Sequence, residues 1–463
     1  MARAAAAIAA LLMFLSANRA AAEFGGASGI LPAGTELGEE ALAQPRELFH
    51  SEAIQGRKSY LVNLGDMAFS APSIFGGVAR QAGLSCNTCH VNGAGNPRFF
   101  LPGLSIRPGT FDTTGALFNP KADNGLLDPV TIPSLRGARQ LAPYGHDGRM
   151  ASLRDFVRSV IVDEFAGAEP APEILDGLVA YIMDIDLLPN PRLGLDGKLA
   201  GRPSEAERRG EALFARPFTH DPGLSCAACH VPSAGFVDHQ QHDVGSYGMF
   251  KTPTLLDANF NAPYFHDGRY GSYEEVVIHF DRMFYLGLTA EDRADLVAYL
   301  RAVGDGEEPS VHDDVDQNVK EAADFLSVLD TAIPARDGTA VTLTVDTVAG
   351  ELRELTEKFP DHKDASVTGG KSERAAARAD LKALVLLLRR VGDAADSGKF
   401  DEAASSFAAF RNKFAGAIPV LMAAEPWSLF DPATHAAHFA ALRQLYQSAV
   451  DPALAMRRPF DSD

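Results

Sequence analysis

The stretch that decides the fold is CNTCH at residues 86–90, and the same arrangement returns as CAACH at residues 226–230. The two motifs use all 4 cysteines of the 463-residue chain. Two thiols three residues apart can reach the two vinyl groups of one haem as thioethers, and the adjacent histidine then lies under the iron as an axial ligand. The sequence therefore predicts two covalently bound haem c groups, held by Cys86, Cys89 and His90 and by Cys226, Cys229 and His230.

A CxxC pair can also bind zinc or form a redox-active disulfide. A zinc site would need the two distant pairs to come together, and a thioredoxin-type redox pair would need one CxxC on a strand-to-helix turn. A histidine directly after each pair, and the repetition of the motif in Gly-rich and polar surroundings, favour haem over both.

The repeat extends beyond the cysteines. PSL at residues 133–135 returns as PTL at 253–255, and APYGHDGR at 142–149 returns as APYFHDGR at 262–269, with equal spacing in both halves. An apolar-periodic helix closes each half, and a helix precedes each CxxCH, the clearer one running from an N-cap at Ser204 to Phe214. The Gly- and Pro-rich stretch 92–132 is expected to be a long loop.

The chain after about Asp305 carries only helical patterns. Four apolar stripes, within residues 315–329, 345–359, 381–391 and 407–414, predict four amphipathic helices. The fold class we expect is mainly α: two tandem cytochrome c-like haem domains, followed by an antiparallel helical bundle. The expected boundaries are a signal peptide at 1–22, haem domains at 23–200 and 201–308, and the bundle at 309–463.

The N-terminus indicates export. Arg3 precedes an apolar run from Ala4 to Leu15, and small residues at 20–22 suit signal-peptidase cleavage before Glu23. We expect a periplasmic protein with no membrane span after signal removal. The net charge of -19 argues against a nucleic-acid partner, whose phosphates demand a basic face.

With these motifs, residues 45–305 resemble the bacterial di-haem cytochrome c peroxidases and their MauG-like relatives. The resemblance implies that the His90 haem reacts with hydrogen peroxide and that the His230 haem relays electrons to it. It implies an enzyme, a periplasmic oxidoreductase that reduces peroxide or uses it to oxidise a partner. The expected partners are a small redox protein or a quinol-linked electron donor, and a protein substrate.

The first haem site departs from the family pattern in two ways. Family peroxidases carry a blocking histidine after the first CxxCH, but residues 91–145 contain none, so the His90 haem is expected to be open at rest, as in MauG-like members. The family's bridging tryptophan is replaced by His146, and Trp427, the only tryptophan, lies in the expected bundle. His146 is therefore a candidate catalytic residue, with a structural histidine as the alternative.

The resemblance assigns three further roles. Glu164 is the nearest match to the family's acid–base glutamate, displaced by about two positions. At the second haem the family's axial ligand position holds Phe280, which cannot bind iron, so His279 is the preferred neighbour and Met283 the alternative. The family's calcium ion, bound partly by carbonyls, would map to Asn261 and Pro263.

A reading from a different functional class is a non-enzymatic di-haem electron carrier. In that case both irons are six-coordinate, and the helical bundle docks a partner. A high-spin haem in the resting protein would separate the enzyme from the carrier.

Overall fold

The structure is a computed structural model that describes residues 30–37, 45, 47–55, 58–307, 314–361 and 366–438. The chain divides into two compact units, one within Gly29–Val311 and the other within His312–Asp463. The expected signal peptide lies outside the described residues. Helices far outweigh strands among the described residues, as predicted, and no described helix is long and apolar enough to cross a membrane.

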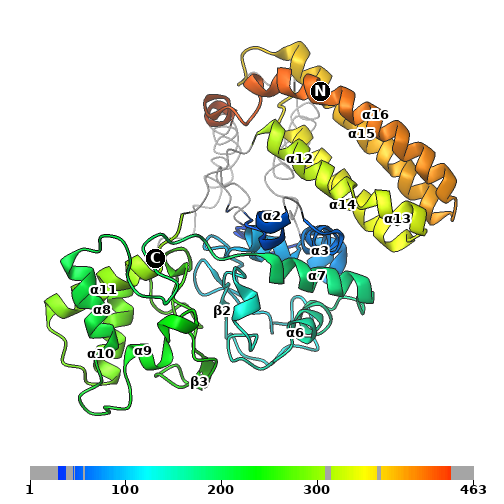
Figure 1. Cartoon of the computed structure of the whole chain (residues 1–463). Helices are drawn as coiled ribbons and strands as arrows, with labels where there is room; N and C mark the ends of the chain where they lie inside the picture. Colours follow the sequence, from blue (N-terminus) through cyan, green and yellow to red (C-terminus); the bar gives the residue numbers. More distant parts are fainter. Residues whose placement is uncertain are drawn as a thin grey trace, which may run out of the picture. The chain divides into compact units, whose positions relative to one another are not determined.

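The unit Gly29–Val311 contains the same series of elements twice (Figure 1). Each series has a helix, a one-turn helix at the CxxC motif, a pair of two-residue strands and two closing helices. The first series is α3 (Tyr60–Ser70), α5 (Cys86–Cys89), β1 (Thr110–Phe111), β2 (Val130–Thr131), α6 (Leu153–Ser159) and α7 (Pro172–Asp184). The second is α8 (Glu205–Ala215), α9 (Cys226–Cys229), β3 (Gln241–His242), β4 (Phe250–Lys251), α10 (Tyr273–Met283) and α11 (Ala290–Val303). Two short helices, α2 (His50–Gln55) and α4 (Gly77–Gln81), accompany the first series.

Glycines allow the first and last helices of each series to cross closely. A Cβ at Gly65 of α3 would lie 1.9 Å from the carbonyl oxygen of Gly177 in α7. A Cβ at Gly210 of α8 would lie 2.1 Å from the carbonyl oxygen of Asp295 in α11. No larger residue fits either crossing without moving backbone, so glycine fixes the same helix pair in both halves.

Local signals set the start of α8 as predicted. Ser204 is the N-cap, its hydroxyl accepts from the amide of Glu207, and the Glu207 carboxylate accepts from the amide of Ser204. The expectation for residues 92–132 was only partly right, because this stretch contributes β1 and β2. These strands pair antiparallel, with Thr110 opposite Thr131 and Phe111 opposite Val130.

The two halves interlock through reciprocal backbone hydrogen bonds. The amide of Thr131, at the end of β2, donates to the carbonyl of His266 in the second half at 2.7 Å. The amide of Lys251, at the end of β4, donates to the carbonyl of His146 in the first half at 3.0 Å. The end of β2 is therefore bound to the His266 segment of the second half, and the end of β4 to the His146 segment of the first half.

The C-terminal unit contains α12 (Val315–Leu326), α13 (Leu329–Ala335), α14 (Gly338–Glu357), α15 (Lys371–Asp396) and α16 (Phe400–Ala424). The predicted first helix is split, because residues 327–328 separate α12 from α13. α15 packs against both α14 and α16, and three residues join α15 to α16, so these two run antiparallel. The apolar stripes predicted from the sequence form the buried face, including Leu381, Leu388 and Phe410.

Candidate functional site

Each CxxCH motif forms a single helical turn. In α5 and α9 the two cysteines stand three residues apart, and the histidine, His90 or His230, is the residue that ends the turn. This spacing puts both sulfurs on one side of the turn with the imidazole next to them. The four thiols are free of disulfides, as thioether attachment requires.

The environment of the cysteines disfavours the two alternatives to haem. Burial raises the pKa of the Cys86 and Cys89 thiols to about 12, whereas redox-active cysteines have lowered pKa values. The metal-type cluster found among the described residues is Cys229, Asp238 and His242, and it includes neither cysteine of the first motif. The two pairs therefore do not combine into one zinc site.

The histidines of both motifs are oriented for binding iron. His90 Nδ1 lies 2.9 Å from the carbonyl oxygen of Pro133, and His230 Nδ1 lies 3.2 Å from that of Phe236. A carbonyl only accepts, so each Nδ1 carries the proton and each Nε2 keeps its lone pair for a metal. Burial lowers the pKa of His90 to about 4, which keeps the ring neutral at pH 7. These donors fit a c-type haem in each half.

Glu164 lies at the end of a π-helix, Val160–Glu164, that continues from α6. Single π-turns often occur at functional sites, because the extra residue changes where the following side chains point. The Glu164 side chain is only 14% exposed and contacts Arg149 Nη2 at 2.9 Å. Burial raises the pKa of Glu164 although the Arg149 cation opposes this shift.

His146 is half-buried where the two halves meet. Its Nε2 lies 2.8 Å from the carbonyl oxygen of Thr131, to which it donates, and it is close enough to His90 and His266 to interact electrostatically with both. Burial lowers the pKa of His146 to about 4. The ring is therefore neutral at pH 7.

The two candidate axial ligands of the second haem line one pocket of about 470 Å³. His279 has both ring nitrogens engaged: Nε2 donates to the carbonyl of Val244 at 2.6 Å, and Nδ1 accepts from the hydroxyl of Tyr270 at 2.8 Å. Met283 lies one turn further along α10. Val277 belongs to the core against which Cys226 packs. His279 and Met283 lie about 200° and 240° around the helix from Val277, so both are on the face of α10 that is turned away from this core.

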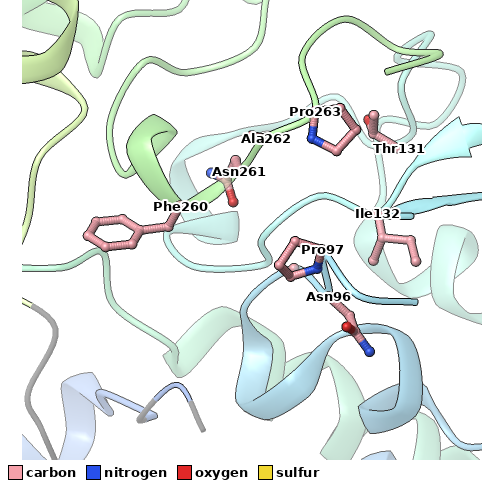
Figure 2. Close-up of a pocket in the computed structure, with 10 residues that line it drawn as sticks. Asn96, Pro97, Thr131, Ile132, Phe260, Asn261, Ala262 and Pro263 are labelled. Atoms are coloured by element: carbon pink, nitrogen blue, oxygen red, sulfur yellow. The ribbon is translucent and has the colours of Figure 1, made fainter. Parts of the chain in front are cut away.

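A small pocket lies where the two halves meet (Figure 2). Asn261 and Pro263, the residues expected to offer carbonyls to calcium, line it from the second half. Asn96, Pro97 and Thr131 line it from the first half. Carbonyl oxygens are among the ligands that a hard cation such as calcium prefers.

Three features of the site had no separate signal in the sequence. Arg149 pairs with Glu164, although the two are fifteen residues apart across an irregular turn. Asp238 accepts from His242 Nε2 at 2.7 Å beside Cys229. Lys251 extends from β4 to carbonyls of the other half. The repeat could have drawn attention to Lys251, because Thr131 holds the equivalent place in the first half.

A sequence model of the family described as "Di-haem cytochrome c peroxidase" matches residues 204–303, which run from the N-cap of α8 to the end of α11. The match covers the second of the two repeated series.

Three relatives resemble the chain over different lengths. The hydrazine synthase subunit gamma of Kuenenia stuttgartiensis is 25% identical over 307 residues, which are 53% of this chain and 78% of the relative. The cytochrome-c peroxidase IdrP1 of Pseudomonas sp. (strain SCT) is 37% identical over 78 residues, 14% of this chain and 20% of the relative. The methylamine utilization protein MauG of Methylorubrum extorquens is 32% identical over 126 residues, 21% of this chain and 34% of the relative. The chain thus spans 20% of the length of this peroxidase and 34% of that of this MauG protein.

Proposed function

Because the chain carries a domain of the di-haem cytochrome c peroxidase and MauG family, whose chemistry is haem-based and redox, we propose that it is a periplasmic di-haem oxidoreductase. It reduces hydrogen peroxide, or uses peroxide to oxidise a partner, at the His90 haem. The His230 haem relays the electrons.

The observation that carries this proposal is the largely buried carboxyl group of Glu164, in the same half as the His90 haem motif. A bound haem supplies an iron that accepts peroxide and exchanges electrons. The protein has to move one proton between the two peroxide oxygens, and a glutamate with a raised pKa is suited to this task. Glu164 has such a pKa, and Arg149 holds its carboxylate in one orientation.

His146 contributes as a neutral group between the halves. Its hydrogen bond to Thr131 fixes the ring, and its low pKa keeps a positive charge out of the space between the two haem motifs. Because the His146 ring is neutral and held in one orientation, it is suited to an electron-transfer path between the haems, along which neither its charge nor its position has to change. In this role His146 replaces the bridging tryptophan of the family.

For the second haem we propose Met283 as the axial ligand in preference to His279. His279 would have to give up its hydrogen bond to Val244 before its Nε2 could bind iron. The thioether of Met283 carries no proton and needs no such exchange. A thioether ligand also raises the reduction potential, which suits a haem that passes electrons on.

We also propose a calcium ion in the pocket of Figure 2, held by the carbonyls of Asn261 and Pro263. Two carbonyls and water would give the oxygen ligands that calcium prefers. The ion would hold the two halves together and take no part in proton transfer.

A resting optical and EPR spectrum of the holoprotein tests the proposal against its alternative. The enzyme requires one high-spin haem that changes on addition of peroxide without prior reduction. A wholly low-spin protein that is inert to peroxide would instead identify a di-haem electron carrier, with a small redox protein or a quinol-linked donor as its partner. A protein substrate, if peroxide serves to oxidise one, would be recognised by the C-terminal unit.

A further inference from the structure

A clamp from the second half holds residues 141–147 of the first half. We use the term clamp for His239, Gln241 and Lys251, whose side chains all donate to backbone carbonyls of that segment. His239 Nδ1 lies 2.7 Å from the carbonyl of Ala142, and the Gln241 amide donates to the carbonyl of Asp147. Since every acceptor is main chain, the clamp fixes the course of the segment that carries His146.

Lys251 supplies the cation of this clamp. Its Nζ donates to the carbonyl oxygens of Leu141 at 2.8 Å and of Pro143 at 2.7 Å, and its amide donates to the carbonyl of His146. Burial lowers the pKa of Lys251 to about 8, so the ammonium is still charged at pH 7. Its partners are neutral carbonyls, an arrangement that resembles a bound metal ion more than a surface salt bridge.

The internal repeat gives this arrangement a counterpart in the other half. Residues 131, 141 and 143 occupy the places of 251, 261 and 263 in the repeat. In the second half, Asn261 and Pro263 line the pocket of Figure 2, and Thr131 is among the residues that line it from the first half. Threonine has a short, neutral side chain and brings no cation to these carbonyls. The carbonyl pair of Leu141 and Pro143 is therefore occupied by the Lys251 ammonium, whereas the equivalent residues Asn261 and Pro263 line a pocket.

We propose that Lys251 is a tethered cation that takes the place of a metal ion in the carbonyl pair of Leu141 and Pro143, and thereby positions the His146 segment against the second half. A lysine suits this place because its three donors can satisfy two carbonyls at once. Because it is attached to the chain, it loses less freedom on binding than a dissolved ion does. The proposal concerns Lys251 alone and does not depend on peroxide chemistry or on an ion beside Asn261.

The first test removes the charge in the full-length holoprotein. Lys251→Met keeps the length of the side chain but leaves two carbonyls without their donor, so the Tm should fall by roughly 4 °C or more. Lys198→Met, at an exposed lysine just before the second half begins, is the matched control and should not change the Tm. Equal melting temperatures for Lys251→Met and the wild type would overturn the proposal.

The second test asks whether the carbonyl pair is a cation site. Lys251→Thr copies Thr131 of the other half and should bind one more calcium ion per chain than the wild type does, measured by equilibrium dialysis at about 1 mM Ca²⁺. Calcium should also restore the Tm of Lys251→Thr but not that of Lys251→Met. A lysine that only fills space predicts no added calcium and no rescue, and that outcome would overturn the proposal.

Discussion

The guanidinium of Arg149 lies 2.9 Å from the carboxylate of Glu164 and joins the end of a π-helix to the segment that carries His146. The same guanidinium lies 3.3 Å from Asp147 Oδ1 and 5.1 Å from the centre of the Phe156 ring. In the described part of the second half, Arg269 pairs with Asp267, as Arg149 does with Asp147, but it has no ion pair that corresponds to Glu164. The arginine-bound glutamate that we propose as the proton carrier, Glu164, therefore lies in the half with His90, where we propose that peroxide reacts.

Replacing Glu164 by glutamine should slow peroxide consumption by roughly 10²-fold or more, the usual size of a general acid–base contribution. Haem content should not change, because Glu164 holds no part of the cofactor. Asp163→Asn, at the exposed neighbouring carboxylate, is the control and should retain full activity. A Glu164→Gln protein that consumes peroxide at the wild-type rate would remove Glu164 from the mechanism.

The pH profile of peroxide consumption should report the same carboxyl group. Since only the ionised form can accept a proton, the rate should fall on the acid side at a pH above the ordinary glutamate pKa, because burial raises the pKa of Glu164. Arg149→Met removes the cation that lowers this pKa, so the acid limb should move to still higher pH. An acid limb that is unchanged by Arg149→Met would assign it to another group.

His146 should make the fold sensitive to acid. Its pKa is lowered to about 4 in the folded chain, so between this value and the ordinary 6.5 the unfolded chain binds the extra proton. Stability is then highest above pH 6.5 and falls as the pH approaches 4. His146→Asn keeps a donor for Thr131 without titrating, and urea unfolding should show that it avoids roughly 3 kcal/mol of this loss. His220→Asn, at an exposed histidine, should lose stability like the wild type.

The ligand of the second haem can be identified with a pair of variants. Met283→Ala should convert a low-spin signal to high-spin, because it removes the proposed thioether. His279→Ala should leave that signal unchanged, since both nitrogens of His279 are already hydrogen-bonded. The opposite pair of results would assign the iron to His279, and two unaltered spectra would exclude both residues.

The number of bound haems tests the assignment on which the proposed function rests, namely one covalent haem at each CxxCH motif. Mass spectrometry of protein made with the c-type maturation machinery should show two haem additions, and the Cys226→Ala, Cys229→Ala double variant should retain one. The same spectrum should show loss of about the first 22 residues if the N-terminus is a signal peptide. A single addition in the wild type would falsify the di-haem assignment.

The sequence alone determined the parts of this protein that depend on short-range spacing. CxxCH predicts a haem because thiols and imidazole must lie on one turn, and the equal spacing of PSL and APYGHDGR predicts a repeated unit without any knowledge of contacts. Ser204 fixed the start of α8 for the same reason, since a capping box acts within four residues. The apolar stripes located the C-terminal helices but missed the break at residues 327–328, which interrupts the helix without disturbing the apolar period.

Only the tertiary structure decided how the chemistry-bearing side chains are paired. Lys251 contacts Leu141, which is 110 residues away in the chain. His279 is hydrogen-bonded to Val244, which is 35 residues away in a loop. No local pattern specifies such pairs, because the course of these loops follows from how the two halves pack. The sequence thus named His279 as a ligand from its position, and the fold showed that its nitrogens are already engaged. The π-turn before Glu164 belongs to the same class, since one extra residue in a helix changes the direction of a carboxylate and leaves no trace in the residue pattern.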